Sequence, residues 1–242
     1  MSRQLNEKST PEQIRSRFDN DVERFSNLET GQTAAIDAAY CLDLIAQAAT
    51  NHTPNMSHIL DIGCGAGNFT LRILQQLKHN QVHVSLNDLS PNMLERASTR
   101  IASQTTGQIT LLQNDIRNKD LPEKQYDCVV AAMVLHHLRE EHEWSQVFQK
   151  LHTAIKPGGA LWIYDLVEHD NHTLHQLAWQ QYSDYLVNFK DAEYRDLVFD
   201  YIDQEDSPRP LMWQLTQLEN AGFSCVDVLH KHGVCAAYCA FK

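Results

Sequence analysis

A short apolar run leads directly into a cluster of glycines, and this stretch constrains the fold more than any other. Residues 59–62 (Ile-Leu-Asp-Ile) are typical of a buried strand, and Gly63, Gly65 and Gly67 follow at alternate positions. Apolar residues then recur at helical spacing from Phe69 onward. Strand, glycine turn and helix form the first unit of a doubly wound α/β sheet, which binds ligands at the carboxyl ends of its strands.

The glycine spacing argues against a nicotinamide-dependent oxidoreductase. Glycines let backbone amides approach a ligand closely, and they adopt positive φ where a turn requires it. The pattern here is Gly-x-Gly-x-Gly, whereas dinucleotide binders have Gly-x-Gly-x-x-Gly, and Asn68 stands where their third glycine would fall. A glycine cluster alone is also compatible with a tight turn that holds no ligand, so the following strands have to distinguish the two.

The next two predicted strands are followed by polar residues that suit a nucleoside. The strand over 83–87 ends at Asp88, 25 positions after the first glycine, where two carboxylate oxygens can face a ribose diol. The strand over 109–113 is followed by Asp115 and Ile116, which offer an acceptor for an adenine amino group, a backbone amide and an apolar wall. For each position, a plain strand end or surface turn is the alternative.

Further strands complete the predicted sheet. Residues 126–133 are nearly all apolar, as expected of a central strand that is buried on both faces. A Lys-Pro-Gly-Gly turn at 156–159 precedes a strand over 160–165. Two last strands, 225–229 and 234–238, are joined by a short break and predict a hairpin.

These motifs, in this order, resemble those of the class I S-adenosylmethionine (SAM) dependent methyltransferases over residues 55–165 and 218–242. The resemblance implies an α/β fold with a Rossmann-like seven-stranded sheet of order 3-2-1-4-5-7-6, whose last strand is antiparallel. It also implies SAM as the cofactor, S-adenosylhomocysteine (SAH) as the product, and transfer of the sulfonium methyl group to an acceptor.

The resemblance assigns cofactor contacts to individual positions. The methionine part of SAM is expected at the glycine turn, the ribose after the second strand, the adenine after the third, and the amino group at the carbonyl that ends the fourth. In that order, the residues are Asp61, Gly63, Cys64 and Gly65; Asp88 and Leu89; Asp115 and Ile116; and Ala132.

The chain is predicted to divide into a sheet domain and two helical additions. Residues 55–165 and 216–242 form the SAM-binding domain, and residues 1–54 are expected to be an amino-terminal helical cap. Residues 166–215 show helical spacing and are expected to be an insert after strand five that acts as a lid over the acceptor. Purely structural helices are the alternative for the amino-terminal part.

In layout, the chain is most similar to the carboxy-SAM synthase branch, whose enzymes belong to a tRNA wobble-uridine pathway. Residues 18–25 read Phe-Asp-x-x-Val-x-x-Phe, and residues 221–223 read Ala-Gly-Phe, as in that branch. Gln32, however, takes the place of a cofactor-contacting tyrosine, and we expect it to contact the cofactor from there. Phe199 stands near where that branch has an arginine for the transferred carboxylate. Without this charge partner, we expect the chain to use SAM itself.

Several residues are candidates for the acceptor side. His137 is a candidate general base, because an imidazole titrates near neutral pH, although a histidine without a proton role is the alternative. Tyr182 and Tyr185 could line an acceptor pocket or belong to the core. A run of three histidines lacks the further ligands of a metal site, so no metal is predicted; these are His169, His172 and His175.

Composition narrows the substrate class. The chain has 31 acidic and 20 basic side chains, a net charge of −11, which disfavours nucleic acid and favours a small-molecule acceptor. Its apolar runs are too short for a membrane span, and its start lacks a signal-peptide pattern. Six cysteines without Cys-x-x-Cys spacing fit free thiols, and we expect a cytoplasmic protein.

Three functions therefore stay open at this point. The first is a SAM-dependent methyltransferase for a small molecule. The second is an enzyme like the carboxy-SAM synthases, or one related to tRNA modification, that uses a SAM derivative. The third is a SAM-binding protein without catalytic activity. A homodimer formed through the amino-terminal helices is also open.

Overall fold

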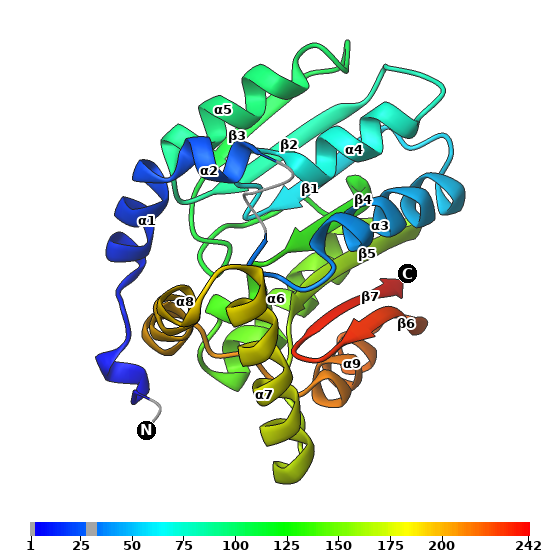
Figure 1. Ribbon diagram of the computed structural model, residues 1–242. Coiled ribbons are helices and arrows are strands. Elements are labelled where there is room, and N and C mark those ends of the chain that lie inside the picture. The colour runs from blue at the N-terminus through cyan, green and yellow to red at the C-terminus, as the bar shows by residue number, and fades with distance from the viewer. Residues whose placement is uncertain (1–2, 28–32) are drawn as a thin grey trace.

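The computed structural model describes residues 3–27 and 33–242 and contains one seven-stranded sheet (Figure 1). The strand order is β3-β2-β1-β4-β5-β7-β6, as the resemblance implied. The strands are β1 (His58–Ile62), β2 (His83–Asp88), β3 (Ile109–Gln113), β4 (Tyr126–Ala132), β5 (Ile155–Leu166), β6 (Cys225–His232) and β7 (Cys235–Phe241). In this sheet β7 runs antiparallel to β5 and β6, whereas β1 to β5 pair in parallel and direct their carboxyl ends to one edge.

Helices cover both faces of the sheet. Core residues of one face join those of α3, α4 and α5, whereas the other face packs on α6 and α9. The helices are η1 (Leu5–Glu7), α1 (Pro11–Asn20), α2 (Val22–Ser26), α3 (Ala38–His52), α4 (Asn68–Gln76), α5 (Pro91–Ile101), η2 (Leu135–His137), α6 (Glu141–Ala154), α7 (His172–Phe189), α8 (Ala192–Glu205) and α9 (Leu211–Asn220).

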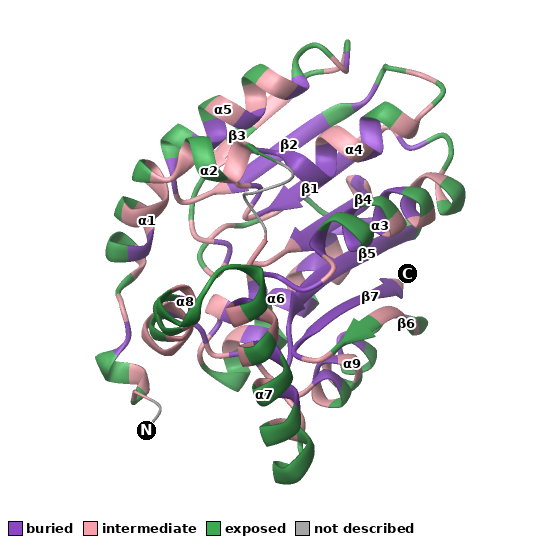
Figure 2. Ribbon diagram, in the orientation of Figure 1, coloured by how far each residue is buried: buried purple, intermediate pink, exposed green. Residues whose placement is uncertain are grey.

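The central strands are apolar because both of their faces are buried. Ile59 belongs to the core on one face and Leu60 to the core on the other, as the two-residue period of a strand requires. Figure 2 shows the buried residues concentrated along the strands, whereas α7 is exposed along much of its length. Within the described residues, no helix has the length and apolar character needed to cross a membrane.

Local sequence signals set the starts of two helices near the cofactor-binding edge. The hydroxyl of Ser90 accepts a hydrogen bond from the amide of Met93 (3.1 Å) and caps α5, with Pro91 in the first helical position. Thr10 and Gln13 form a capping box at the start of α1. Both caps use residues that favour a helix start from sequence alone.

The observed elements differ from the sequence prediction in three places. The stretch 156–159, which the sequence predicts to be a turn before the strand, belongs to β5, because this strand begins at Ile155. Within residues 1–54, which are expected to be helical, α3 begins only at Ala38, and residues 33–37 before it form a turn segment. The break expected between the last two strands is shorter, because β6 continues through His232 and turns at Gly233 with φ of 54°. A register shift between Val228 and His230 accommodates this longer strand.

We expect the packing of α6 on the sheet to be a main source of stability. Phe148 is fully buried between α6 and the strands, whereas its neighbour Gln149 is exposed. Replacing Phe148 by alanine leaves a cavity in the core and should lower the free energy of unfolding by about 3–5 kcal/mol. Gln149→Ala, the matched control, should change it by less than about 0.5 kcal/mol in urea denaturation. Equal effects of the two substitutions would contradict this account of the core.

Candidate active site

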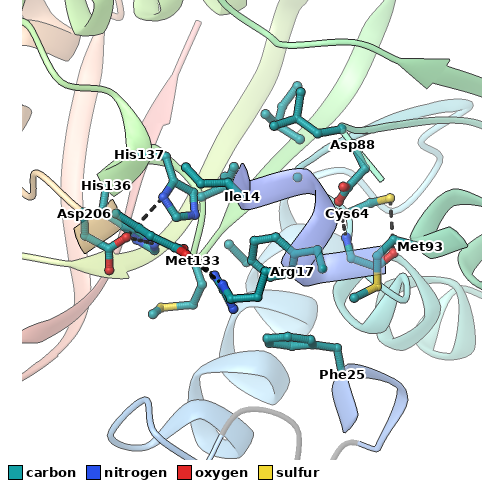
Figure 3. Close-up of a pocket in the computed structure, with 18 of the residues that line it drawn as sticks. Ile14, Arg17, Phe25, Cys64, Asp88, Met93, Met133, His136, His137 and Asp206 are labelled. Carbon is teal, nitrogen blue, oxygen red and sulfur yellow. Dashed lines mark hydrogen bonds and ion pairs between the residues drawn. The ribbon is translucent and has the colours of Figure 1, made fainter. Parts of the chain in front are cut away.

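A cavity of about 270 Å³ lies at the carboxyl edge of the sheet. The ends of β1, β2 and β4 and the loop after β3 form its inner walls, and α1, α2 and α8 close it from outside. Figure 3 shows Cys64 and Asp88 on one side, His136, His137 and Asp206 on the other, and Arg17 between them. The cavity therefore joins the predicted cofactor residues to helices that lie outside the sheet.

The three glycines of the turn after β1 serve different purposes. A Cβ atom on Gly63 would lie 2.3 Å from Cγ2 of Val134, and one on Gly67 would lie 3.1 Å from Cβ of Ala97. A Cβ atom on Gly65 would meet no atom within 4 Å, although Gly65 lines the cavity. Two glycines thus permit close packing, and Gly65 leaves backbone open to a ligand.

Asp88 lies at the end of β2 and connects the glycine turn to α5. One carboxylate oxygen accepts a hydrogen bond from the amide of Gly65, and the other accepts one from the amide of Ser90, both at 2.9 Å. Burial raises the pKa of Asp88, while these amides oppose the rise. Because each carboxylate oxygen has more than one lone pair, both can still accept hydrogen bonds from a diol. Leu89 lines the cavity next to it.

Asp61 is a buried carboxyl group beneath the glycine turn. It accepts a hydrogen bond from the hydroxyl of Thr70 at 2.7 Å. Burial raises its pKa to about 7, the nearby carboxylate of Asp88 adds to the rise, and the Thr70 hydroxyl opposes it. The proton on Asp61 is therefore held weakly enough to be displaced by a cation near neutral pH.

The backbone amide of Cys64 is already used within the protein. It donates to the carbonyl of Asn87 at 2.9 Å, which fixes the turn against β2. The Cys64 thiol is buried, and burial raises its pKa well above the usual range. Cys64 therefore shapes the turn through its backbone and does not offer a reactive thiolate.

The residues after β3 also line the cavity, but Asp115 has a partner that the sequence did not predict. Its carboxylate accepts hydrogen bonds from Nε (3.0 Å) and Nη2 (2.6 Å) of Arg117, and Arg117 also bonds to Glu143. Burial favours a higher pKa for Asp115, but the bonds from Arg117 outweigh it and lower the pKa. Ile116 and Ala132 line the cavity, and their predicted cofactor contacts stay predictions.

Two adjacent histidines follow β4 and differ in their partners. His136 is buried, with Nδ1 bonded to a carboxylate oxygen of Asp165 and Nε2 3.6 Å from Asp206 Oδ1. His137 places Nδ1 at 3.1 Å from the same oxygen of Asp206. Burial favours a lower pKa for His136, but Asp206 and Asp165 outweigh it and raise the pKa to about 9. His136 thus balances two buried carboxylates, and His137 is the more exposed imidazole.

The two candidate tyrosines hold the segment before α3 through their hydroxyl groups. Tyr182 donates to the carbonyl of Ala34 (2.8 Å), and Tyr185 donates to that of Thr33 (2.9 Å). Tyr182 lines the cavity, whereas Tyr185 is not among the lining residues. Gln32 lies outside the described residues, so its predicted cofactor contact stays a prediction.

The sequence prediction missed an ion pair between α1 and α8. Nε of Arg17 donates to Glu205 Oε1 at 2.8 Å, and the guanidinium lies 5.1 Å from the centre of the Tyr201 ring. Both charged residues line the cavity. Phe199 does not line it, because its ring packs on Trp179 and Tyr182. No local pattern signals a pair whose members are 188 residues apart in the chain.

Comparison with known proteins shows which family and relatives the chain is similar to. Residues 59–159 match the family model of a methyltransferase domain. Over 134 residues, the chain is 30% identical to the carboxy-S-adenosyl-L-methionine synthase of Shewanella denitrificans, covering 55% of this chain and 54% of that protein. The chain thus spans about half the length of that relative.

Two solved structures have the same fold. A putative SAM-dependent methyltransferase from Methanococcus maripaludis has a TM-score of 0.60 at 18% identity, covering 100% of this chain and 97% of that one. The structure of PigF with SAH has a TM-score of 0.64 at 16% identity, covering 98% and 64%. Residues 59–159 are therefore similar to a methyltransferase domain, and the fold is that of these two solved structures.

The raised pKa of His136 predicts how stability depends on pH. A proton bound more tightly in the folded state stabilises the fold fully below the unfolded pKa of about 6.5, and this contribution is lost as the pH rises through about 9. We expect the free energy of unfolding to fall by about 1–2 kcal/mol between pH 6.5 and pH 8, below the pH at which the buried cysteine thiols also contribute. Urea denaturation at several pH values measures it.

Substitutions identify the source of that pH dependence. His136→Gln, which cannot titrate, should abolish most of the fall, although its stability at pH 6.5 is also reduced. His142→Gln, at an exposed position of α6, should retain the whole of it. A pH dependence that is the same in all three proteins would show that another group is responsible.

Proposed function

We propose that the protein transfers the methyl group of SAM to a small, mainly apolar acceptor that carries an acidic O–H or similar group. The observation that carries this proposal is the single cavity that joins an open glycine turn to a histidine–aspartate pair across an apolar space. The end of the cavity at the glycine turn suits SAM, which is an amino acid that carries a nucleoside. The end at His137 suits removal of a proton from the acceptor.

The residues around the turn fit SAM by their chemistry. The open backbone at Gly65 leaves room that a side chain would fill, and Asp88 retains acceptor sites for ribose hydroxyl groups. Asp61 would balance the ammonium group of the methionine part by giving up its proton. SAM supplies an electrophilic methyl group on a sulfonium, so the protein has to align an acceptor and exclude water.

The outer walls of the cavity support a small, largely apolar acceptor. Side chains from α1 and α2 face others from α8 and the end of β4, and most are aliphatic or aromatic: Ile14, Phe18, Phe25, Met133, Tyr194, Leu197, Val198 and Tyr201. We infer that α1, α2 and α8 act together as the lid over the acceptor. The net charge of −11 supports a small molecule over a nucleic acid.

His137 is the residue we assign to proton removal. Nδ1 of His137 lies 3.1 Å from Asp206, and in the tautomer with its proton on Nδ1 the Nε2 atom carries the lone pair that can take a proton from the acceptor. The acceptor then attacks as an anion, the new bond forms to the methyl carbon, and SAH leaves as the neutral thioether. Asp206 would position the imidazole and stabilise its charge.

The similarity to carboxy-SAM synthases supports one second candidate, an enzyme that uses a SAM derivative. Against it, Phe199 packs against α7, and Arg17 in the cavity is already paired with Glu205. Mass spectrometry of the nucleoside that copurifies with the protein separates the two candidates. A cytoplasmic location is also part of the proposal, and six free cysteines support it.

Calorimetric titration tests the cofactor assignment. The wild-type protein, freed of carried nucleoside, should bind SAM and SAH, and Asp88→Asn should weaken both by at least about tenfold, because one ribose acceptor is replaced. Asp120→Asn, the same change at an exposed position, should bind like the wild type. Failure of the wild type to bind either compound would refute the cofactor assignment, and unchanged binding by Asp88→Asn would refute the ribose contact.

A screen of phenols and other hydroxylated aromatic compounds with radiolabelled SAM tests the acceptor class and the base. With an accepted compound, His137→Gln should lower kcat by about 10²–10⁴-fold and leave the Kd for SAM within about twofold, because the imidazole acts on the acceptor. His142→Gln should retain full activity. An unchanged kcat in His137→Gln would mean that the acceptor needs no base, and no turnover with any compound would favour a binding protein.

A further inference from the structure

A second cluster of ligating side chains lies apart from the cavity, where the segment before α3 meets the hairpin of β6 and β7. Oδ2 of Asp37 lies 2.9 Å from Nε2 of His230 and 2.8 Å from Nδ1 of His232. These three atoms all lie within 4.8 Å of one another. The three residues are not among those that line the cavity.

Distant parts of the chain bring this cluster together. His230 and His232 are two positions apart on β6, so their side chains point to the same face of the strand. The register shift after Val228 sets which face that is. Asp37 comes immediately before α3 and adopts a left-handed conformation, with φ of 61°, that directs its carboxylate to the hairpin. The site thus depends on two local irregularities that a plain hairpin and helix start would not need.

The donor set suits a divalent transition metal ion. Zinc takes imidazole nitrogen and carboxylate oxygen at about 2.0–2.2 Å, which places tetrahedral ligand atoms about 3.4 Å apart. The carboxylate–imidazole distances here are 2.8 and 2.9 Å, so shifts of a few tenths of an ångström accommodate an ion. Lys231 directs its amine to His169 and the carbonyl of Gly233. The half-exposed His232 leaves a side of the site open for water as a further ligand.

The position of the cluster connects it to the cavity wall. Ala34 and Ala35 line the cavity, and Asp37 ends the same short segment. Three tyrosines hold carbonyls of this segment, through the pairs Tyr185–Thr33, Tyr182–Ala34 and Tyr164–Ile36. An ion on Asp37 would add a fourth attachment, between this segment and the hairpin.

We propose that Asp37, His230 and His232 form a binding site for a divalent transition metal ion, best suited to zinc, that fastens residues 33–37 to the β6–β7 hairpin. The role is structural: the ion holds one wall of the cavity in place and takes no part in methyl transfer. The proposal does not depend on the proposed function, because neither the ligands nor the attachment involves SAM.

Titration of the tag-free full-length protein with zinc chloride, after dialysis against a chelator, tests the site. Calorimetry should show one ion per chain, and elemental analysis after gel filtration should give the same ratio. Zinc at about 100 times its Kd should raise the melting temperature by roughly 5–10 °C, because the ion binds the folded state only. Absence of binding at a one-to-one ratio would overturn the proposal.

Single substitutions locate the ion. His230→Gln and His232→Gln should each weaken zinc binding at least tenfold, and circular dichroism should confirm that both stay folded. Asp37→Asn should also weaken zinc binding, and it should keep the backbone in place because asparagine tolerates the left-handed conformation. His172→Gln, an exposed histidine outside the cluster, should bind zinc as the wild type does.

One further variant separates this site from a second group of possible ligands in the cavity, His136, His137 and Asp206. His137→Gln should leave zinc binding unchanged if the ion lies on Asp37. Loss of binding in His137→Gln, with binding retained in His232→Gln, would place the ion in the cavity and overturn the proposal. Removal of zinc should leave the rate of methyl transfer unchanged if the ion is structural. A complete loss of methyl transfer, with the Kd for SAM unchanged, would contradict the structural role.

Discussion

The hydrogen bond from the amide of Gly65 to the carboxylate of Asp88 fixes the part of the cavity wall that the turn after β1 and the end of β2 form. It ties the turn after β1 to the end of β2, and the second oxygen of Asp88 ties the same strand end to the start of α5. The carboxyl group is partly buried, which limits the water that competes for these bonds. The shape of the open surface at Gly65, where we place the cofactor, depends on this one carboxylate.

Buried charge is balanced at the opposite side of the cavity in a different way. Asp165 and Asp206 are both buried, and His136 lies between them with a raised pKa, so a positive charge compensates two negative ones. Arg17 and Glu205 form a separate pair that joins α1 to α8. A buried charge without its partner is costly, so these pairs position the outer helices as well as neutralise the site.

The division between sheet and added helices also explains what the relatives share with this chain. The family match ends at residue 159, before α7 and α8 begin. The matched part holds the glycine turn and the carboxylates that we assign to SAM, whereas α8 and the amino-terminal helices supply most of the apolar wall. Under this proposal, proteins of one class keep the cofactor side and differ in the acceptor. Arg17 and Glu205 lie in the added helices and therefore belong to the acceptor side of the cavity.

Sequence alone determined the glycine turn, most strand segments and the acidic strand ends, because periodicity, glycine spacing and caps such as Ser90 act over a few neighbouring residues. The sheet order followed from the family resemblance and not from these local patterns. Only the tertiary structure decided the partners: Arg17 on Glu205, and the two histidines of β6 on Asp37. It also turned the hydroxyl of Tyr182 to a backbone carbonyl. Such contacts join residues that folding brings together from up to 195 positions apart, and no local preference of the chain specifies them.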